Sequence, residues 1–379
     1  MHRSLSVIAF IACFTLVYSQ HQTVTILVIP EKSGRDSSLN IFIAGNKKEF
    51  GNWNPSAVAL NKQNDSLWKF EASFDSGEVI EFKLTRGSWQ NQAIYDRTII
   101  PANTIIKVRK DTTIMLRPIY WNKQLLSSGS EKSIRGKVKY HRGLAGAGLA
   151  YKRDVIVWLP PLYEKNKANR YPVLYMHDGQ NIFDPATSFT GNDWRIDEVT
   201  DSLIRLNKIE EIIIVGIYNS PDRLPEYSDS PLGTAYMKFI VDVLKPLIDS
   251  TYRTKRERKY TAVMGSSMGA LSSLLLGWKY PNVFGMIGCM STSFWYDNEK
   301  TLKDIRSDTG AKKKIKIYLD CGGREKELLS GYKRMTAILK KKGYKKGRDF
   351  EYHLEKNGAH SEVYWAKRVW RPLVFMFGG

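Results

Sequence analysis

The sequence predicts an α/β fold with a largely parallel sheet, preceded by a smaller all-β sandwich. Two observations lead to this prediction. In the first 120 residues, short strand-like runs are separated by turn residues and show no helical period. Beyond them, continuous apolar strand runs alternate with amphipathic helical stretches, a pattern typical of strands covered on both faces by helices.

The first 19 residues have the features of a removable export signal. Arg3 gives a positive start, an apolar stretch follows as far as Val17, and Ser19 ends a plausible cleavage site. We therefore expect a secreted or periplasmic protein that is cleaved near Ser19. A lipoprotein anchored through Cys13 fits less well, because Phe10 is unusual at its position and the preceding apolar stretch is short.

The composition indicates a globular, strongly basic chain. Its 379 residues are 42% hydrophobic and carry a formal net charge of +20, so two domains are expected. The basic residues form scattered clusters without a nucleic-acid-binding motif, which favours solvated faces or attraction to acidic glycans or cell surfaces over a nucleic-acid partner. No later apolar run is long enough for an integral membrane segment. Cys289 and Cys321 adjoin apolar runs, and two buried free thiols are favoured over a disulfide.

The all-β domain is expected over residues 20–120, and residues 121–133 are expected to form a linker because they are polar, serine-rich and without apolar periodicity. The predicted strands of the sandwich are residues 23–29, 39–45, 67–74, 79–86 and 104–118.

The α/β domain is expected over residues 134–379. Amphipathic helices are predicted over 232–252 and 328–341. The predicted strands are residues 155–160, 172–179, 211–218, 260–266, 314–320 and 350–358.

A serine between small residues ends one of these strands. Gly265-Ser266-Ser267-Met268-Gly269 fits the pattern G-x-S-x-G, and the next residues have helical spacing. Glycines two positions to either side remove side chains that would collide where a strand turns sharply into a helix, so Ser267 would be exposed at the helix start. The plainer alternative is an ordinary tight βα loop.

A serine nucleophile requires a histidine base, itself oriented by a carboxylate, and in this fold the chain order is serine, acid, histidine. His360 lies in a loop after the last strand, whereas His353 lies within that strand, so His360 is the favoured base. Asp320, at a strand end, and Glu325, a few residues into the next loop, are both candidates for the acid.

The segment "MHDGQNIFD", residues 176–184, follows an early strand of the α/β domain. A loop in this place supplies one backbone N–H of an oxyanion hole, here from Gly179 or Gln180, and Met268 would supply the other. An ordinary turn is the alternative. This chemistry requires no metal and no organic cofactor.

With these residues in place, residues 135–379 resemble the "putative esterase" family of α/β-hydrolases, related to esterase D and to feruloyl, acetyl-xylan and siderophore trilactone esterases. The resemblance implies Ser267 as nucleophile, His360 as base and Glu325 as acid. Ala270 departs from a glycine common in relatives. The segments that carry the family resemblance are "DVIVWLPPLY", "YPVLYMHDGQNIFD", "GNDWRIDEV", "RLPEY", "GSSMGALSSL", "DCGGREKE" and "GAHSEVYW".

The first domain resembles the starch-binding carbohydrate module, family twenty, through "IFIAGNKKEFGNWNPSAVAL", "SLWKFEAS" and "IEFKLTRGSW". The resemblance implies that Trp53 and Trp89 stack on sugar rings and that Lys83 donates hydrogen bonds, whereas Trp68 is expected in the core. The chain after "TRGSW" departs from the usual continuation, so a structural module that binds no sugar is the alternative.

Together these observations predict an exported serine esterase that acts on a carboxylic ester, with an acetyl or feruloyl group on a carbohydrate as the favoured substrate. The expected partner is a polysaccharide or a small ester. Hydrolysis of a siderophore or another small ester is one alternative, and a non-catalytic glycan-binding protein is another. The oligomeric state is left open.

Overall fold

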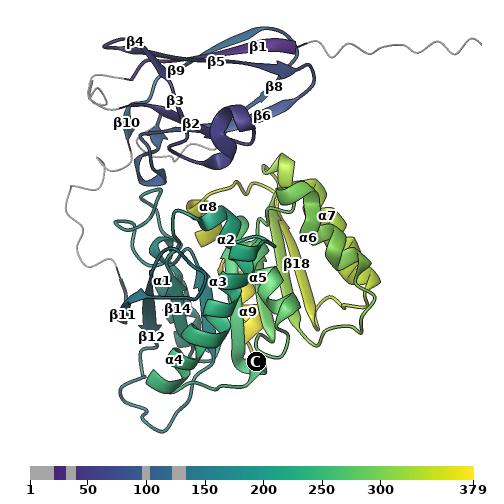
Figure 1. Ribbon diagram of the computed structural model, residues 1–379. Coiled ribbons are helices and arrows are strands. Elements are labelled where there is room, and N and C mark those ends of the chain that lie inside the picture. The colour runs from purple at the N-terminus through teal and green to yellow at the C-terminus, as the bar shows by residue number, and fades with distance from the viewer. Residues whose placement is uncertain (1–20, 31–39, 96–102, 122–133) are drawn as a thin grey trace, which may run out of the picture. The chain divides into compact units, whose positions relative to one another are not determined.

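The structure is a computed structural model in which contacts divide the chain into two compact units, Met1–Trp121 and Asn122–Gly379 (Figure 1). The predicted export signal, residues 1–19, and residues 122–133 of the predicted linker lie outside the described residues. Within the described ranges, none of the helices combines the length and apolar character needed to cross a bilayer. The structure describes residues 21–30, 40–95, 103–121 and 134–379.

The first unit is built from β-strands, as predicted. Its described strands form two four-stranded sheets, ordered β4-β5-β1-β9 and β3-β2-β6-β8, and a short pair, β10-β7. Apolar side chains from both larger sheets share one core, in which the Phe50 ring lies 5.2–5.3 Å from the rings of Phe70, Phe74 and Phe82. The strand bounds are β1 His21–Val28, β2 Phe42–Gly45, β3 Val58–Ala59, β4 Asn61–Asn64, β5 Leu67–Asp75, β6 Val79–Thr85, β7 Ala93–Ile94, β8 Thr104–Lys107, β9 Thr112–Leu116 and β10 Tyr120–Trp121. Short 3-10 turns are η2 Lys48–Trp53 and η3 Trp89–Asn91.

The second unit contains a sheet of eight described strands in the order β11-β12-β14-β13-β15-β16-β17-β18. Neighbours from β14 to β18 pair in parallel, whereas β11 and β12 run antiparallel at one edge. This is the largely parallel sheet that the sequence predicts. The bounds are β11 Lys137–Leu144, β12 Arg153–Leu159, β13 Val173–His177, β14 Ile213–Ile217, β15 Thr261–Ser266, β16 Met286–Met290, β17 Lys316–Gly322 and β18 Phe350–Glu355.

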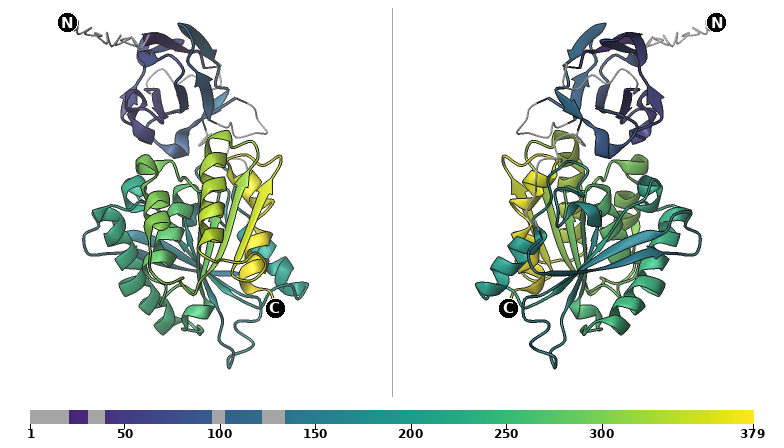
Figure 2. Two further views of the ribbon diagram at one scale, coloured as in Figure 1. Left: turned by 90° about the vertical axis from the view of Figure 1, so that its right-hand side faces the viewer. Right: turned by 90° about the vertical axis from the view of Figure 1, so that its left-hand side faces the viewer.

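Helices cover both faces of this sheet (Figure 2). Alternate residues of one strand enter different cores: Val155 and Val157 of β12 belong to one apolar cluster, and Ile156 and Trp158 to the other. The first cluster includes side chains of the five helices α3, α4, α5, α6 and α7. The second includes side chains of α1, α8 and α9. The bounds are α1 Ile196–Arg205, α2 Arg223–Glu226, α3 Pro231–Lys238, α4 Lys245–Thr251, α5 Met268–Lys279, α6 Tyr296–Ser307, α7 Lys326–Lys341, α8 Glu362–Ala366 and α9 Trp370–Phe377, with the short turns η5 Gly179–Asn181 and η7 Arg258–Tyr260.

Several elements differ from the sequence-based expectation. Strand β11 of the second unit was not predicted, and the single strand expected over 104–118 is divided into β8 and β9, which lie in different sheets. Strand β16 was not predicted, because its run "MIGCM" is short and contains a glycine. The single helix expected over 232–252 consists of α3 and α4 joined by a π-helical segment, η6 Phe239–Leu244. The free, buried state of Cys289 and Cys321 is confirmed.

Candidate active site

Ser267 lies at the turn between β15 and α5, where the G-x-S-x-G pattern predicts it. Its backbone has φ 56° and ψ −121°, a conformation that side-chain-bearing residues rarely adopt. A Cβ on Gly265 would lie 2.6 Å from the carbonyl carbon of Gly269, and one on Gly269 would lie 3.1 Å from Cβ of His177. Both glycines are therefore required by close packing, as the sequence predicts.

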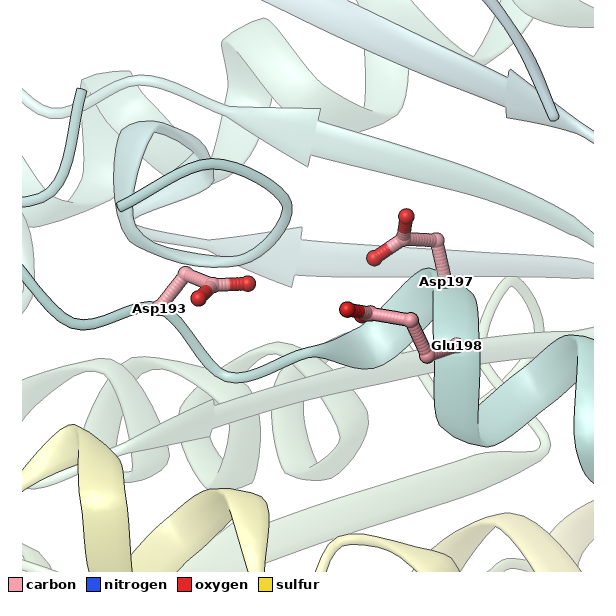
Figure 3. Close-up of side chains that lie close together, drawn as sticks. All are labelled: Asp193, Asp197 and Glu198. Carbon is pink, nitrogen blue, oxygen red and sulfur yellow. The ribbon is translucent and has the colours of Figure 1, made fainter. Parts of the chain in front are cut away.

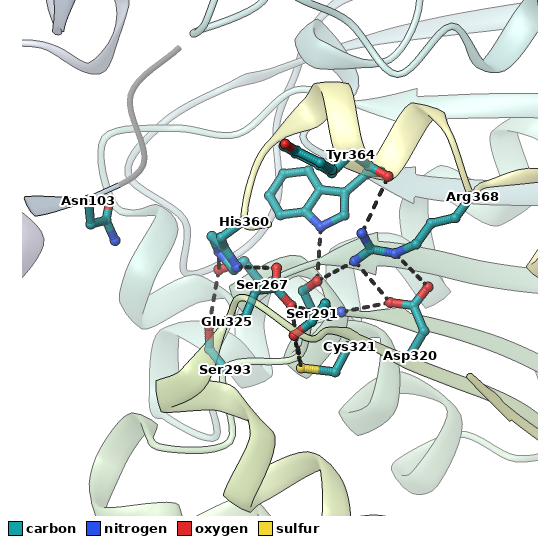
Figure 4. A network of polar contacts seen from close by, with 12 residues as sticks. Asn103, Ser267, Ser291, Ser293, Asp320, Cys321, Glu325, His360, Tyr364 and Arg368 are labelled. Atoms are coloured by element: carbon teal, nitrogen blue, oxygen red, sulfur yellow. Dashed lines mark hydrogen bonds and ion pairs between the residues drawn. The ribbon is translucent and has the colours of Figure 1, made fainter. Parts of the chain in front are cut away.

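The structure brings Ser267, His360 and Glu325 together (Figure 4). Nε2 of His360 lies 2.9 Å from Oγ of Ser267, and Nδ1 of the same ring lies 3.1 Å from Oε1 of Glu325. His353 instead lies within β18, where its Nε2 contacts Oε2 of Glu355 at 3.2 Å. The arrangement is a serine, histidine and carboxylate joined in one hydrogen-bonded line.

The environment of Glu325 keeps its carboxylate ionised. Burial alone would raise its pKa, but the hydrogen bond and charge of His360, the charge of Arg368 and the N–H of Gly322 outweigh burial and lower the pKa to about 2. The Gly322 N–H donates to Oε2 at 2.6 Å, and the thiol of Cys321 lies 3.3 Å from the same oxygen. A charged acceptor therefore faces His360 at neutral pH.

The loops that carry the acid and the histidine are in direct backbone contact. The N–H of Arg324 donates to the carbonyl of Gly358 at 3.0 Å, and that of Gly323 donates to the carbonyl of Glu355 at 2.7 Å. A Cβ on Gly322 would lie 2.5 Å from the carbonyl oxygen of Gly358. The parallel pairing of β17 with β18 thus continues into their loops and fixes Glu325 near His360.

Asp320, the other candidate acid, has a different partner. Its Oδ2 accepts from Nε of Arg368 at 3.0 Å, and its Oδ1 from Nη2 at 3.2 Å. Both residues are almost completely buried, and burial raises the pKa of Asp320 despite this ion pair. No hydrogen bond joins Asp320 to His360 among the interactions of the described residues.

The candidate oxyanion-hole residues lie on adjacent elements. Met176 of β13 pairs with Met264 of β15, so the turn that begins at Gly179 and the turn at Ser267 leave neighbouring strands at the same edge of the sheet. Met268, Gly179 and Gln180 are all buried.

A buried network fixes the turn that precedes these residues. Asp178, at φ 57°, accepts two hydrogen bonds of 2.7 Å from the guanidinium of Arg223 and one of 2.6 Å from the amide of Asn219. His177 contacts the hydroxyl of Tyr236 through Nδ1 at 2.8 Å, and burial lowers its pKa to about 4. Because His177 is then neutral, the buried charge here is confined to the Asp178–Arg223 ion pair.

Sequence reasoning missed several side chains around the serine. Oγ of Ser293 lies 3.0 Å from Oγ of Ser267, and it comes from the segment after the unpredicted strand β16. The ring of Trp365 lies edge-on to His360 at a centroid distance of 5.0 Å, and its N–H donates to Oγ of Ser291 at 3.0 Å. Ser291 and Ser293 lie in the serine-rich segment "STSFW", which has no pattern of its own, whereas Trp365 ends the segment "GAHSEVYW" that carries the family resemblance.

Of the candidate glycan-binding residues of the first unit, Trp53 and Trp89 lie side by side, and Lys83 is bonded to another side chain. The rings of Trp53 and Trp89 lie 6.3 Å apart at an interplanar angle of 38°. Lys83 of β6 donates from Nζ to Oε1 of Gln92 at 3.0 Å, next to the turn that carries Trp89. Trp68 is only 2% exposed, which confirms its prediction as a core residue.

Three carboxylates cluster before and within the first turn of α1 (Figure 3). Asp193, Asp197 and Glu198 each offer an oxygen within 4.8 Å of the others, and they form the group among the described residues that could hold a metal ion. Burial, followed by the neighbouring Glu198, raises the pKa of Asp197 to about 8, and burial raises that of Asp193 to about 6. Protons therefore reduce the negative charge of this cluster at neutral pH.

Comparison with known proteins identifies a family for each of the two domains. The family model described as "Putative esterase" matches residues 147–376, and the model described as "Starch binding domain" matches residues 24–114. The uncharacterized protein YbbA of Bacillus subtilis (strain 168) is 26% identical over 250 residues, which cover 60% of this chain and 94% of YbbA. An endo-1,4-beta-xylanase/feruloyl esterase of Xylanibacter ruminicola is 29% identical over 197 residues, which cover 50% of this chain and 25% of that protein.

Solved structures share the fold. A ferulic acid esterase is similar with a TM-score of 0.54 at 23% identity, over 64% of this chain and 98% of that chain. Enterochelin esterase from Shigella flexneri is similar with a TM-score of 0.55 at 15% identity, over 93% of this chain and 91% of that chain.

The raised pKa of Asp197 predicts a stability that falls with pH. Between about pH 4 and 8 the folded state holds a proton that the unfolded state releases, so the free energy of unfolding decreases as pH rises through this window. Asp197→Asn keeps an acceptor for the N–H of Arg135, which donates to Oδ2 at 2.6 Å, but cannot titrate. We expect it to gain about 1–3 kcal/mol on wild type between pH 5 and 8, since one pKa unit is worth about 1.4 kcal/mol.

Denaturant unfolding at a series of pH values measures this gain. Glu164→Gln removes an exposed carboxylate and serves as the control. Its free energy of unfolding should change with pH as that of wild type does. A parallel pH dependence in wild type and Asp197→Asn would contradict the raised pKa.

Proposed function

Because this chain belongs to the "Putative esterase" family, and is therefore a carboxylic ester hydrolase, we propose that it cleaves its substrate through a covalent acyl intermediate on Ser267. The observation that supports this mechanism most directly is the hydrogen-bonded line from Ser267 through His360 to Glu325. Serine, acid and histidine also follow the chain order expected for this fold.

In the proposed mechanism, His360 acts first as a base and then as an acid. Its Nδ1–H donates to the ionised Glu325, which leaves Nε2 free to accept the Ser267 proton. Oγ of Ser267 then bonds to the ester carbonyl carbon, and protonated His360 returns the proton to the departing alkoxide. Water, deprotonated by the same imidazole, attacks the acyl-serine and releases the carboxylic acid.

The proposed oxyanion hole consists of backbone N–H groups from Met268 and from Gly179 or Gln180. Met268 begins α5, where N–H groups are unsatisfied within the helix and the helix dipole favours negative charge. Donors fixed before the reaction stabilise the developing alkoxide without reorganisation.

For the substrate, we propose an ester-linked acyl group on a carbohydrate, with acetyl and feruloyl groups as the first candidates. Two findings support this choice: the starch-binding-domain match over residues 24–114, and the relative whose name includes feruloyl esterase. A siderophore or another small ester is the second candidate, because the same catalytic residues would open it.

The mechanism predicts different effects for the two acidic residues near His360. Ser267→Ala should lower kcat by about 10⁴-fold or more, and Glu325→Gln should lower it by about 10²–10⁴-fold, because a neutral amide no longer favours the required tautomer. Asp320→Asn is the matched comparison: it removes a charge that pairs with Arg368 and not with His360, so it should lower the free energy of unfolding but, in protein that remains folded, keep kcat within about tenfold of wild type.

Hydrolysis of p-nitrophenyl acetate measures these rates, and a fluorophosphonate probe maps the nucleophile. Label should be found on Ser267 and be lost in Ser267→Ala. A label on another residue, or an Asp320→Asn variant as inactive as Glu325→Gln, would refute the assignment.

The substrate assignment predicts acid release from acylated glycans. Acetylated and feruloylated xylans should release acetate or ferulate, and should be better substrates, by kcat/KM, than a catecholate trilactone. Ser267→Ala is the control for chemical hydrolysis. A higher kcat/KM for the trilactone would select the siderophore alternative.

The first unit predicts glycan binding through its paired tryptophans. Trp53→Ala and Trp89→Ala should each weaken retardation in starch or glycogen gels by about tenfold or more, because a sugar ring loses its aromatic platform. Tyr140→Ala, an exposed aromatic of the second unit, is the control. Unretarded wild-type protein in starch, glycogen and xylan gels would favour a structural module.

A further inference from the structure

A groove rich in basic residues lies at the amino-terminal edge of the eight-stranded sheet, at the opposite end of the strands from Ser267. Its volume is about 630 Å³, within the range of small-ligand sites. It runs across the starts of β15, β16, β17 and β18, and we call it the cationic groove. It is lined by Arg258, Lys259, Gly285, Met286, Lys312, Lys313, Lys314, Ile315, Lys316, Arg348, Asp349 and Met376.

The cationic groove has a rigid floor. The N–H of Gly285 donates to the carbonyls of Arg258 and Thr261 at 2.9 and 3.1 Å, and the N–H of Lys316 donates to the carbonyl of Gly285 at 2.8 Å. A Cβ on Gly285 would lie 2.4 Å from the carbonyl oxygen of Arg258, so these segments touch. The apolar side chains of the lining, Met286, Ile315 and Met376, are almost completely buried.

The charges of the cationic groove are far from balanced. Seven basic side chains line it, against the single carboxylate of Asp349. Asp349 pairs with both Lys312 and Arg348, and Lys313 lies 3.5 Å from Asp308.

Three ammonium groups remain without an acidic partner. Among the residues that the structure describes, no ion pair neutralises Lys259, Lys314 or Lys316. All three side chains are exposed. Neighbouring unneutralised ammonium groups repel one another and attract an anionic ligand.

The chemistry of the lining favours carboxylates spread along a ligand over a nucleic acid. The guanidinium of Arg258 donates to the carbonyls of Pro281 and Lys314. Its N–H groups are therefore already used and are not available for bidentate binding of a phosphate. Lysine ammonium groups are compact point charges that suit separated carboxylates.

From these observations we propose that the cationic groove binds an acidic polysaccharide through the carboxylates of its uronic acid residues. The choice of a glycan as ligand rests on the proposed function. Strands of five to seven residues separate the groove from the Ser267 edge, about 17–23 Å at about 3.3 Å per residue. The groove therefore tethers the enzyme to its polymer and does not hold the ester that is cleaved.

The test compares two triple variants of the full chain that lose the same charge. The groove variant carries Lys259→Gln, Lys314→Gln and Lys316→Gln. The control variant carries Lys137→Gln, Lys139→Gln and Lys152→Gln, three exposed lysines on or beside β11 and β12 at the far edge of the sheet. Binding to de-esterified polygalacturonate is measured by affinity electrophoresis and by titration at rising salt, with neutral xylan and polyglutamate as comparison polymers.

We expect the groove variant to bind polygalacturonate about tenfold or more weakly than wild type, while the control variant stays within about twofold. Wild-type binding should weaken as salt screens the charges. Both variants should hydrolyse p-nitrophenyl acetate at the wild-type rate, which also shows that they are folded.

Three results would overturn the proposal: no binding of polygalacturonate by wild type, equal losses in the groove and control variants, or equally tight binding of polyglutamate, which would mean that charge alone is recognised. Ser267→Ala separates this proposal from the proposed function, because it should lose hydrolysis and keep polygalacturonate binding. Wild-type protein that binds through the groove but cleaves no ester would refute the esterase mechanism alone.

Discussion

The strained backbone of Ser267 is the constraint on which the site depends. A serine with φ 56° and ψ −121° is stable only where its surroundings hold it, and here the holding is done by packing and backbone hydrogen bonds. The Ser267 N–H donates to the carbonyl of Met290 at 3.0 Å, and its carbonyl accepts from the N–H of Ser293 at 3.2 Å. Strand β16 and the segment after it therefore clamp the turn from the side opposite β13.

A second set of contacts holds the histidine. Arg368 and Asp320 form a buried ion pair, and Arg368 also donates to Oγ of Ser291 at 2.6 Å. Ser291 accepts from the N–H of Trp365, whose ring packs against His360. Breaking a buried pair is far more costly than breaking an exposed one, because a charge is left without compensation. We infer that Asp320 supports the site through its ion pair with Arg368 and leaves the contact with His360 to Glu325.

Features of the fold and the site that depend on residues close together in the sequence could be predicted, whereas features that depend on contacts between distant segments could not. The two classes of domain follow from periodicity, which each segment carries within itself. The turn at Ser267 follows from five consecutive residues, since its steric requirement is met by glycines two positions away. By contrast, β16 lacks a distinctive pattern and depends on the neighbouring strands β15 and β17, which pair with both its edges. Ser293 could not be placed by sequence, because its position near Ser267 depends on that strand.

The sequence by itself determined the class of each domain, and Ser267 and His360 as the candidate nucleophile and base, because each rests on local pattern or chain order. Only the tertiary structure decided between Asp320 and Glu325. These residues are five positions apart on one segment. The contact between the loops after β17 and β18 places Glu325 at His360, whereas Asp320 pairs with Arg368, which lies in the turn between α8 and α9. The cationic groove has the same origin: its lysines lie in separate segments, and the shared edge of a parallel sheet brings their charges together.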